Sequence, residues 1–136
     1  MEFKELMRTL INEELEDITA YKIEIEVLGK DPRCGAEITK LFQDLADQKS
    51  GRLKMLHLIS KRSVSSRQYK KETVRSIEAS LRTHAARAER NALLYKKLIE
   101  ELHNPEHKEA VTVIVAQDLH SLDALRALQA RIKQPQ

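Results

Sequence analysis

The most constraining feature of this sequence is a set of four long segments with helical periodicity, separated by short breaks. In each segment apolar residues recur every three or four positions, which predicts one buried face of an α-helix. The breaks contain the glycines and prolines typical of helix ends, as in "GKDPRCG" (29–35) and "NPEH" (104–107). We expect helices over residues 2–28, 32–62, 73–103 and 105–133.

Four helices of this length predict an all-α four-helix bundle, which we interpret as a single domain over residues 1–136. Each helix would be ~40–45 Å long. The stretch "SKRSVSSRQYKKE" (60–72) makes the connection between the second and third helices the longest. About eleven extended residues can span ~36 Å, enough to cross most of a bundle. An up-down-up-down order with a floppy loop stays open.

Composition and charge favour a cytoplasmic protein. No apolar run approaches the ~18 residues of a membrane span. The start, "MEFKELMRTL", is amphipathic and charged, unlike a signal peptide. The one cysteine, Cys34, cannot form an internal disulfide, which favours a reduced compartment. The net charge of +3 is mild, and we expect the basic connection to be a solvated loop rather than a nucleic-acid-binding surface.

Each apolar stripe is interrupted by a polar residue near the middle of its helix. The interruptions are Glu14, Gln48, Glu89, and Gln117 together with His120. A buried carboxylate must find a partner or shift its pKa, because an unpaired buried charge is costly. Four interruptions at matching heights predict one shared polar layer, which is where bundle proteins build metal sites.

The spacing of these residues resembles that of the ferritin-like di-iron carboxylate proteins, most closely their rubrerythrin-like branch. The segment "EELEDITAY" (13–21) is similar to that branch's Glu-x-x-Ala-x-x-Phe-Tyr pattern, with Glu14 at the ligand position and Tyr21 at the tyrosine. The segment "ERNALLY" (89–95) places Glu89 at the equivalent ligand position of the third helix.

The second and fourth helices depart from the family pattern, in which each carries Glu-x-x-His. "QKSG" (48–51) has Gln48 at the glutamate and Gly51 at the histidine. "QDLH" (117–120) has Gln117 at the glutamate and keeps His120. The same exchange of glutamate for glutamine in both motifs indicates a change from metal ligation toward hydrogen bonding.

The resemblance implies an iron-dependent oxidoreductase, peroxidase- or ferroxidase-like, but with an altered site. One hypothesis is a single, weakly bound divalent metal (Fe, Mn or Zn) held by Glu14, Glu89 and His120, with Gln48 and Gln117 as weak ligands or hydrogen-bonding neighbours. Two carboxylates would balance one such ion, whereas two ions would leave excess charge in the core. The alternative is a metal-free polar core in a non-catalytic bundle used for assembly or partner binding. Ordinary surface polarity, from a stripe assigned to the wrong helix face, also stays open.

Two further expectations concern His84 and self-association. His84 lies about one turn before Glu89, where a packed core histidine is favoured over a replacement ligand for position 51. The segment "VTVIVA" (111–116) has apolar residues on more than one side of its helix. We therefore expect at least a homodimer that buries the outward part of this segment. The sequence identifies neither a substrate nor an electron-donor protein.

Overall fold

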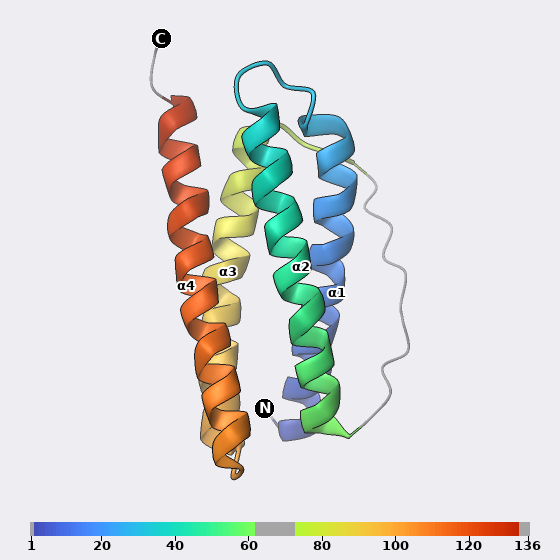
Figure 1. Ribbon diagram of the computed structural model, residues 1–136, viewed down its shortest axis with the longest axis vertical. Coiled ribbons are helices and arrows are strands. Elements are labelled where there is room, and N and C mark those ends of the chain that lie inside the picture. Colours follow the sequence, from blue (N-terminus) through green and yellow to red (C-terminus); the bar gives the residue numbers. More distant parts are fainter. Residues whose placement is uncertain (1, 62–72, 134–136) are drawn as a thin grey trace.

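The computed structural model describes residues 2–61 and 73–133, which form four α-helices and no strand (Figure 1). The helices are α1 (Phe3–Leu28), α2 (Gly35–Ser60), α3 (Ile77–Glu101) and α4 (Pro105–Lys133). The predicted all-α, four-helix architecture is confirmed. The expected long connection between the second and third helices falls mainly on residues 62–72, which lie outside the described residues. None of the described helices is both long and apolar enough to cross a membrane.

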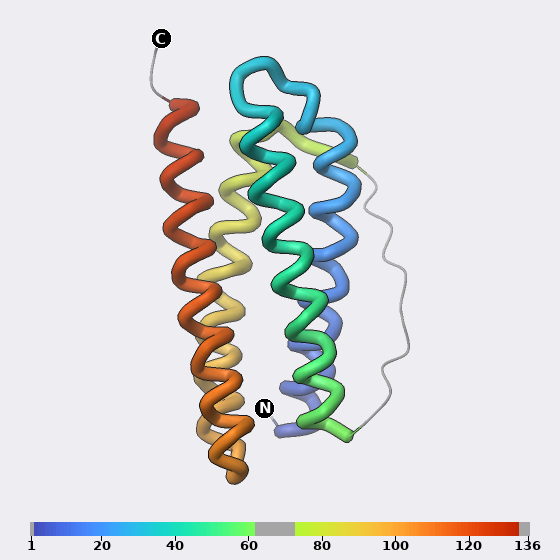
Figure 2. The backbone as a smooth tube through the Cα atoms, in the orientation of Figure 1, coloured from blue at the N-terminus to red at the C-terminus, as the bar shows by residue number. Residues whose placement is uncertain are grey.

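The four helices form two hairpins, α1–α2 and α3–α4, which pack side by side (Figure 2). Polar contacts between the hairpins show that α1 is antiparallel to α3 and that α2 is antiparallel to α4, because rising residue numbers on one helix meet falling numbers on the other. Consequently α2 and α3 run in the same direction (Figure 1). The contacts are Asp17 with Arg87, Glu24 with Ser80, Arg52 with Asp118, and Glu37 with Arg131.

Two of the helix starts are set by side-chain caps. The Ser76 hydroxyl accepts a hydrogen bond of 3.2 Å from a backbone N–H of the first turn of α3, so this helix starts later than expected, not at Thr73. The Asn104 side chain accepts a hydrogen bond of 2.8 Å from the Glu106 N–H, and α4 begins at Pro105 as predicted.

The turn between α1 and α2 requires two glycines. Gly29 ends α1, as predicted, and a Cβ at Gly35 would lie 2.3 Å from the Gly29 carbonyl oxygen. This close approach excludes a side chain at Gly35, where α2 begins, three residues later than the predicted start at residue 32.

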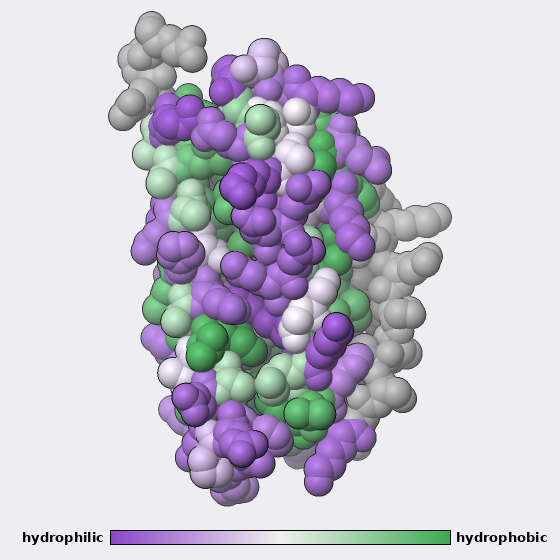
Figure 3. Space-filling model, viewed as in Figure 1, coloured by the Kyte–Doolittle hydropathy of each residue, from purple (hydrophilic) through white to green (hydrophobic). Residues whose placement is uncertain are grey.

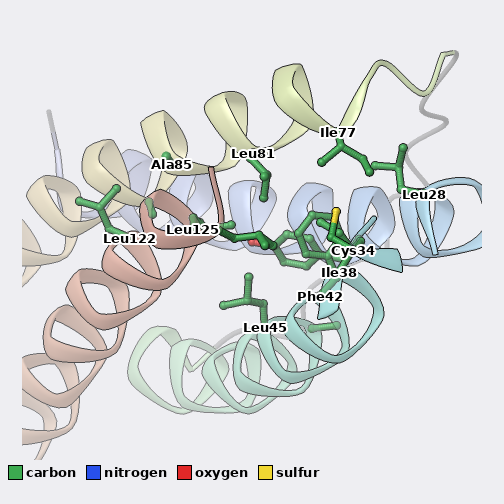
Figure 4. Packing of buried hydrophobic residues seen from close by; sticks show 14 residues of the cluster. Leu28, Cys34, Ile38, Phe42, Leu45, Ile77, Leu81, Ala85, Leu122 and Leu125 are labelled. Carbon is green, nitrogen blue, oxygen red and sulfur yellow. The ribbon is translucent and has the colours of Figure 1, made fainter. Parts of the chain in front are cut away.

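The apolar core is divided into two clusters. The first includes Phe42, Leu81 and Leu125, and Figure 4 shows side chains from α2, α3 and α4 converging on it. The second, nearer the N-terminus of α1, includes Leu10 and Leu56. On every helix the residues of the two clusters are separated by buried polar positions, which therefore form a layer across the bundle.

Candidate functional site

Five buried charged side chains cross the middle of the bundle, and we call them the charged layer. They are Glu14 and Asp17 from α1, Lys49 and Arg52 from α2, and Asp118 from α4. Burying so many charges is costly unless each is paired, so the contacts of each side chain decide what the layer can do.

Lys49 places its ammonium group between the two carboxylates of α1. Its Nζ lies 3.4 Å from Glu14 Oε1 and 3.0 Å from Asp17 Oδ2. Glu14 and Asp17 are three residues apart and therefore share one face of α1. Burial acts to lower the pKa of Lys49, but the charges of Glu14 and neighbouring groups outweigh it and raise that pKa. Lys49 is therefore held as a cation.

Arg52 joins α2 to the three other helices. Its Nη1 lies 2.6 Å from Asp118 Oδ1 and 3.5 Å from Glu14 Oε2, and its Nε donates a 3.4 Å hydrogen bond to Gln117 Oε1. Its guanidinium carbon lies 5.8 Å from the centre of the Tyr95 ring on α3, within cation–π range. Burial opposes its charge, but Glu14 and Asp118 raise the pKa of Arg52.

Arg87 on α3 contributes a third cation at the edge of the layer. Its Nε lies 2.6 Å from Asp17 Oδ1, and its Nη2 lies 2.6 Å from Glu13 Oε2. Burial acts to raise the pKa of Asp17, but Lys49 and Arg87 outweigh it and lower that pKa. Three acidic groups, Glu14, Asp17 and Asp118, thus face three basic ones, and their formal charges balance.

The remaining acidic groups respond mainly to burial. Burial raises the pKa of Glu14 and of Asp118, although the nearby cations oppose it. Hydrogen bonding is incomplete at one buried residue of α3 and one of α4. The Asn91 amide and Asp118 Oδ2 are buried and have no hydrogen-bond partner within residues 2–61 and 73–133.

A second buried polar group, which we call the Glu24 group, lies within the first apolar cluster. The Ser80 hydroxyl donates a 3.0 Å hydrogen bond to Glu24 Oε1, and His84 Nε2 lies 2.6 Å from Glu24 Oε2. The imidazole of His84 is flanked by the rings of Tyr21 and Phe42, with ring centres 4.7 and 5.3 Å away. His84 is thus a packed core histidine, as favoured from the sequence, and its polar partner is Glu24.

The structure does not bring the predicted metal ligands together. Glu14 is buried in the layer, as predicted. Glu89 is 60% exposed and pairs with Arg126 at 3.0 Å on the outside of the bundle, and His120 is also exposed. The expectation that Glu89 and His120 face the core is therefore wrong.

The two glutamines lie at the margin of the layer rather than within it. Gln48 and Gln117 are half-buried, and Gln117 accepts a hydrogen bond from the layer residue Arg52. Gly51 is exposed, and a Cβ there would meet open space. The buried residues are instead Lys49, Arg52 and Asp118, each one position after the expected 48, 51 and 117. A shift of one residue rotates a side chain by about 100° around an α-helix.

The layer residues missed from the sequence are the two cations of α2 and the aspartate of α4. A usable signal was present, because the 3–4 spacing of the buried face of α2 continues without interruption through the charged residues. That face is Phe42, Leu45, Lys49, Arg52, Leu56 and Ile59.

The charged layer, as it stands, does not fit a metal ion. Five of the six carboxylate oxygens of Glu14, Asp17 and Asp118 already face Lys49, Arg52 or Arg87. An added divalent ion would lie close to these cations in a medium of low dielectric constant, where repulsion is strong. Within the part of the chain that the structure describes, no group of three or more His, Cys, Asp or Glu side chains is arranged to hold a metal.

Comparison with known proteins leaves the family of this chain open. The resemblance to rubrerythrin-like proteins rests on sequence motifs alone. Of the ligand positions in those motifs, only Glu14 lies in the charged layer. No protein-family model, no curated protein and no solved structure matches the chain.

Proposed function

We propose that this protein is a non-catalytic helical bundle of ferritin-like ancestry that acts by self-association. The observation that carries the proposal is the pairing of the buried carboxylates with the chain's own cations. A catalytic acid, base or metal ligand must reach a substrate or an ion, whereas these groups are buried and already engaged. The shared direction of α2 and α3 supports the ancestry, because ferritin-like bundles have one long crossover.

The outer face of the α3–α4 hairpin is the surface proposed for association. Leu93 on α3 is 61% exposed and Leu119 on α4 is 44% exposed. Leu93 follows Glu89 by one turn, and Leu119 precedes Arg126 by two turns. Because the Glu89–Arg126 pair joins these antiparallel helices, both leucines lie on the same side of that pair, toward the α3–α4 turn.

The outward part of the segment 111–116 extends the same surface. Val113 is 52% exposed, and Ala116 is exposed between it and Leu119 on the outer side of α4. Figure 3 shows the face on which α2 and α4 lie nearest the viewer, and this face is mainly hydrophilic with apolar side chains in small separate areas. Leu93, Val113, Ala116 and Leu119 together give the α3–α4 hairpin an exposed apolar surface for a second copy of the chain.

The test is the mass of the full chain by light scattering at micromolar concentration. We expect at least a dimer, and we expect Leu93→Asp with Leu119→Asp to shift it toward the monomer. Leu58→Asp is the matched control, because Leu58 is 64% exposed but lies on α2, and this variant should keep the wild-type mass. A wild-type monomer at all accessible concentrations would exclude self-association.

A parallel measurement tests the non-catalytic part of the proposal. Metal analysis of wild type purified without added metal, followed by an iron-oxidation assay, should give no stoichiometric metal and no oxidase activity. One or more tightly bound irons per chain would instead favour the metal-dependent oxidoreductase of the sequence resemblance.

A further inference from the structure

We infer that Lys49 and Arg52 are built-in cations that keep metal ions out of the layer, and that they occupy inward positions of α2 from which a bundle protein could build a metal site. This inference rests on the proposed function and states how metal chemistry is prevented. Its structural basis is the position of these two residues, at i and i+3 on the inward face of α2. Bundle metal sites take the pair Glu-x-x-His from the same kind of position.

The surrounding carboxylates are arranged around these two cations. Lys49 Nζ lies within 3.4 Å of oxygens from both Glu14 and Asp17, and Arg52 Nη1 lies within 3.5 Å of oxygens from both Glu14 and Asp118. Glu14 therefore bridges the two positive charges with its two oxygens. A bridging carboxylate between two cations, with a further carboxylate on each side, is a ligand arrangement that suits two hard cations as well as two basic side chains.

Exclusion follows from charge and from space. Lys49 and Arg52, together with Arg87 at the edge of the layer, already balance the three carboxylates, so an added divalent ion would introduce excess positive charge into the core. The side chains of Lys49 and Arg52 also fill the volume next to the carboxylate oxygens, since both are buried. Replacing the two cations by ligands should therefore convert the layer into a metal site without any change at Glu14, Asp17 or Asp118.

The experiment compares two double variants of the full chain with Co²⁺ as the probe. Lys49→Glu with Arg52→His places Glu-x-x-His in the inward register that the structure shows. Gln48→Glu with Gly51→His is the matched control, because it adds the same residue types one position earlier, in the register expected from the sequence. Equilibrium dialysis gives the stoichiometry, Co²⁺ absorbance reports the ligands, and thermal melts report coupling to folding.

We expect Lys49→Glu with Arg52→His to bind at least one Co²⁺ per chain and its melting temperature to rise by at least about 5 °C when Co²⁺ is added, since a ligand that binds only the folded state stabilises it. Wild type and the control should show neither effect. A response of the control equal to that of the inward-register variant would overturn the inference.

A second variant keeps the test decisive if added carboxylates prevent folding without metal. Lys49→Gln with Arg52→His removes both cations and adds no negative side chain, and it should bind one Co²⁺ per chain with three carboxylates and one imidazole available. If this variant is helical by circular dichroism and binds no Co²⁺, the layer is not a masked metal site, while the proposed non-catalytic function still stands. Stoichiometric, stabilising Co²⁺ binding by wild type would overturn both.

Discussion

The charged layer and the Glu24 group stabilise buried carboxylates in two different ways. In the charged layer three carboxylates face three cations, and the contacts join all four helices. In the Glu24 group one carboxylate lies against Ser80 and His84, and these two contacts join α1 to α3. Neighbouring carboxylates in the charged layer repel one another and need cations between them, whereas the Glu24 group places a single carboxylate against a hydroxyl and an imidazole.

The largest expected effect comes from removing a cation of the charged layer. Arg52→Met keeps an unbranched, buried side chain but leaves Asp118 and one oxygen of Glu14 without their cation. Breaking a buried ion pair from one side costs about 3–5 kcal/mol. Urea unfolding of wild type and variant measures the loss. Lys54→Met, at an exposed position of α2, is the control and should stay within about 0.5 kcal/mol.

A smaller effect, with a defined pH dependence, is expected for Asp17→Asn. The variant should lose about 1.5–3 kcal/mol near pH 7, the range for hydrogen bonds to charged groups. Because the folded-state pKa of Asp17 is lowered, its contribution is present above the unfolded pKa of about 4 and is lost as the pH falls through the folded-state pKa. Denaturant unfolding at pH 7, 5, 4 and 3 should show the difference shrinking below about pH 4.

Glu14→Gln should show the opposite pH dependence of stability in the same unfolding measurement. Burial raises the pKa of Glu14, so its titration favours folding below the unfolded pKa, and this contribution is lost as the pH rises through the folded-state pKa. The stability of Glu14→Gln relative to wild type should therefore improve as the pH rises over that window. Identical pH profiles for the two variants would contradict the distinction between these neighbouring acids.

The Glu24 group should tolerate loss of its charge better than the charged layer does. Glu24→Gln retains shape and one acceptor oxygen, and His84 can present either a donor or an acceptor nitrogen to the new amide. We expect a loss of about 1 kcal/mol, measured by urea unfolding. A loss as large as that of Arg52→Met would show that the two groups do not differ in the way their contacts indicate.

The smallest effects are expected at two residues that the sequence pattern placed in the site. Glu89→Gln removes an exposed ion pair with Arg126, and such pairs contribute about 0–1 kcal/mol. His120→Ala changes an exposed side chain and should stay within about 0.5 kcal/mol. The melting temperatures of both variants should stay within about 5 °C of that of wild type, and a drop of about 10 °C in either would place that residue in the core.

The helices were predictable from the sequence because periodicity and helix-end residues agree. Glycine and asparagine at the ends of α1 and α4 gave correct boundaries, and most apolar residues lie on the expected faces. The start of α3 was missed because two residues that can cap a helix, Thr73 and Ser76, both precede the periodic segment. Propensity alone does not choose between such neighbours.

The site was predicted only in part, because buried charge is a property of partners and not of single residues. Glu14 was placed correctly because it continues the helical spacing of the buried residues Met7 and Leu10, which the adjacent Glu13 does not. In α2 a glutamine and a lysine are adjacent, and hydropathy favours burying the glutamine. The lysine is buried because Asp17 and Glu14 meet it from another helix, which no local pattern shows. The uninterrupted 3–4 spacing was the better guide.

The division of the core by the charged layer also fixes the relative height of the helices. Apolar side chains of similar size can exchange neighbours when one helix slides along another by a turn, about 5.4 Å. Such a slide of α2 would carry Lys49 and Arg52 away from their carboxylates and into one of the apolar clusters. The layer therefore acts as a register mark that penalises misaligned packings more than it stabilises the correct one.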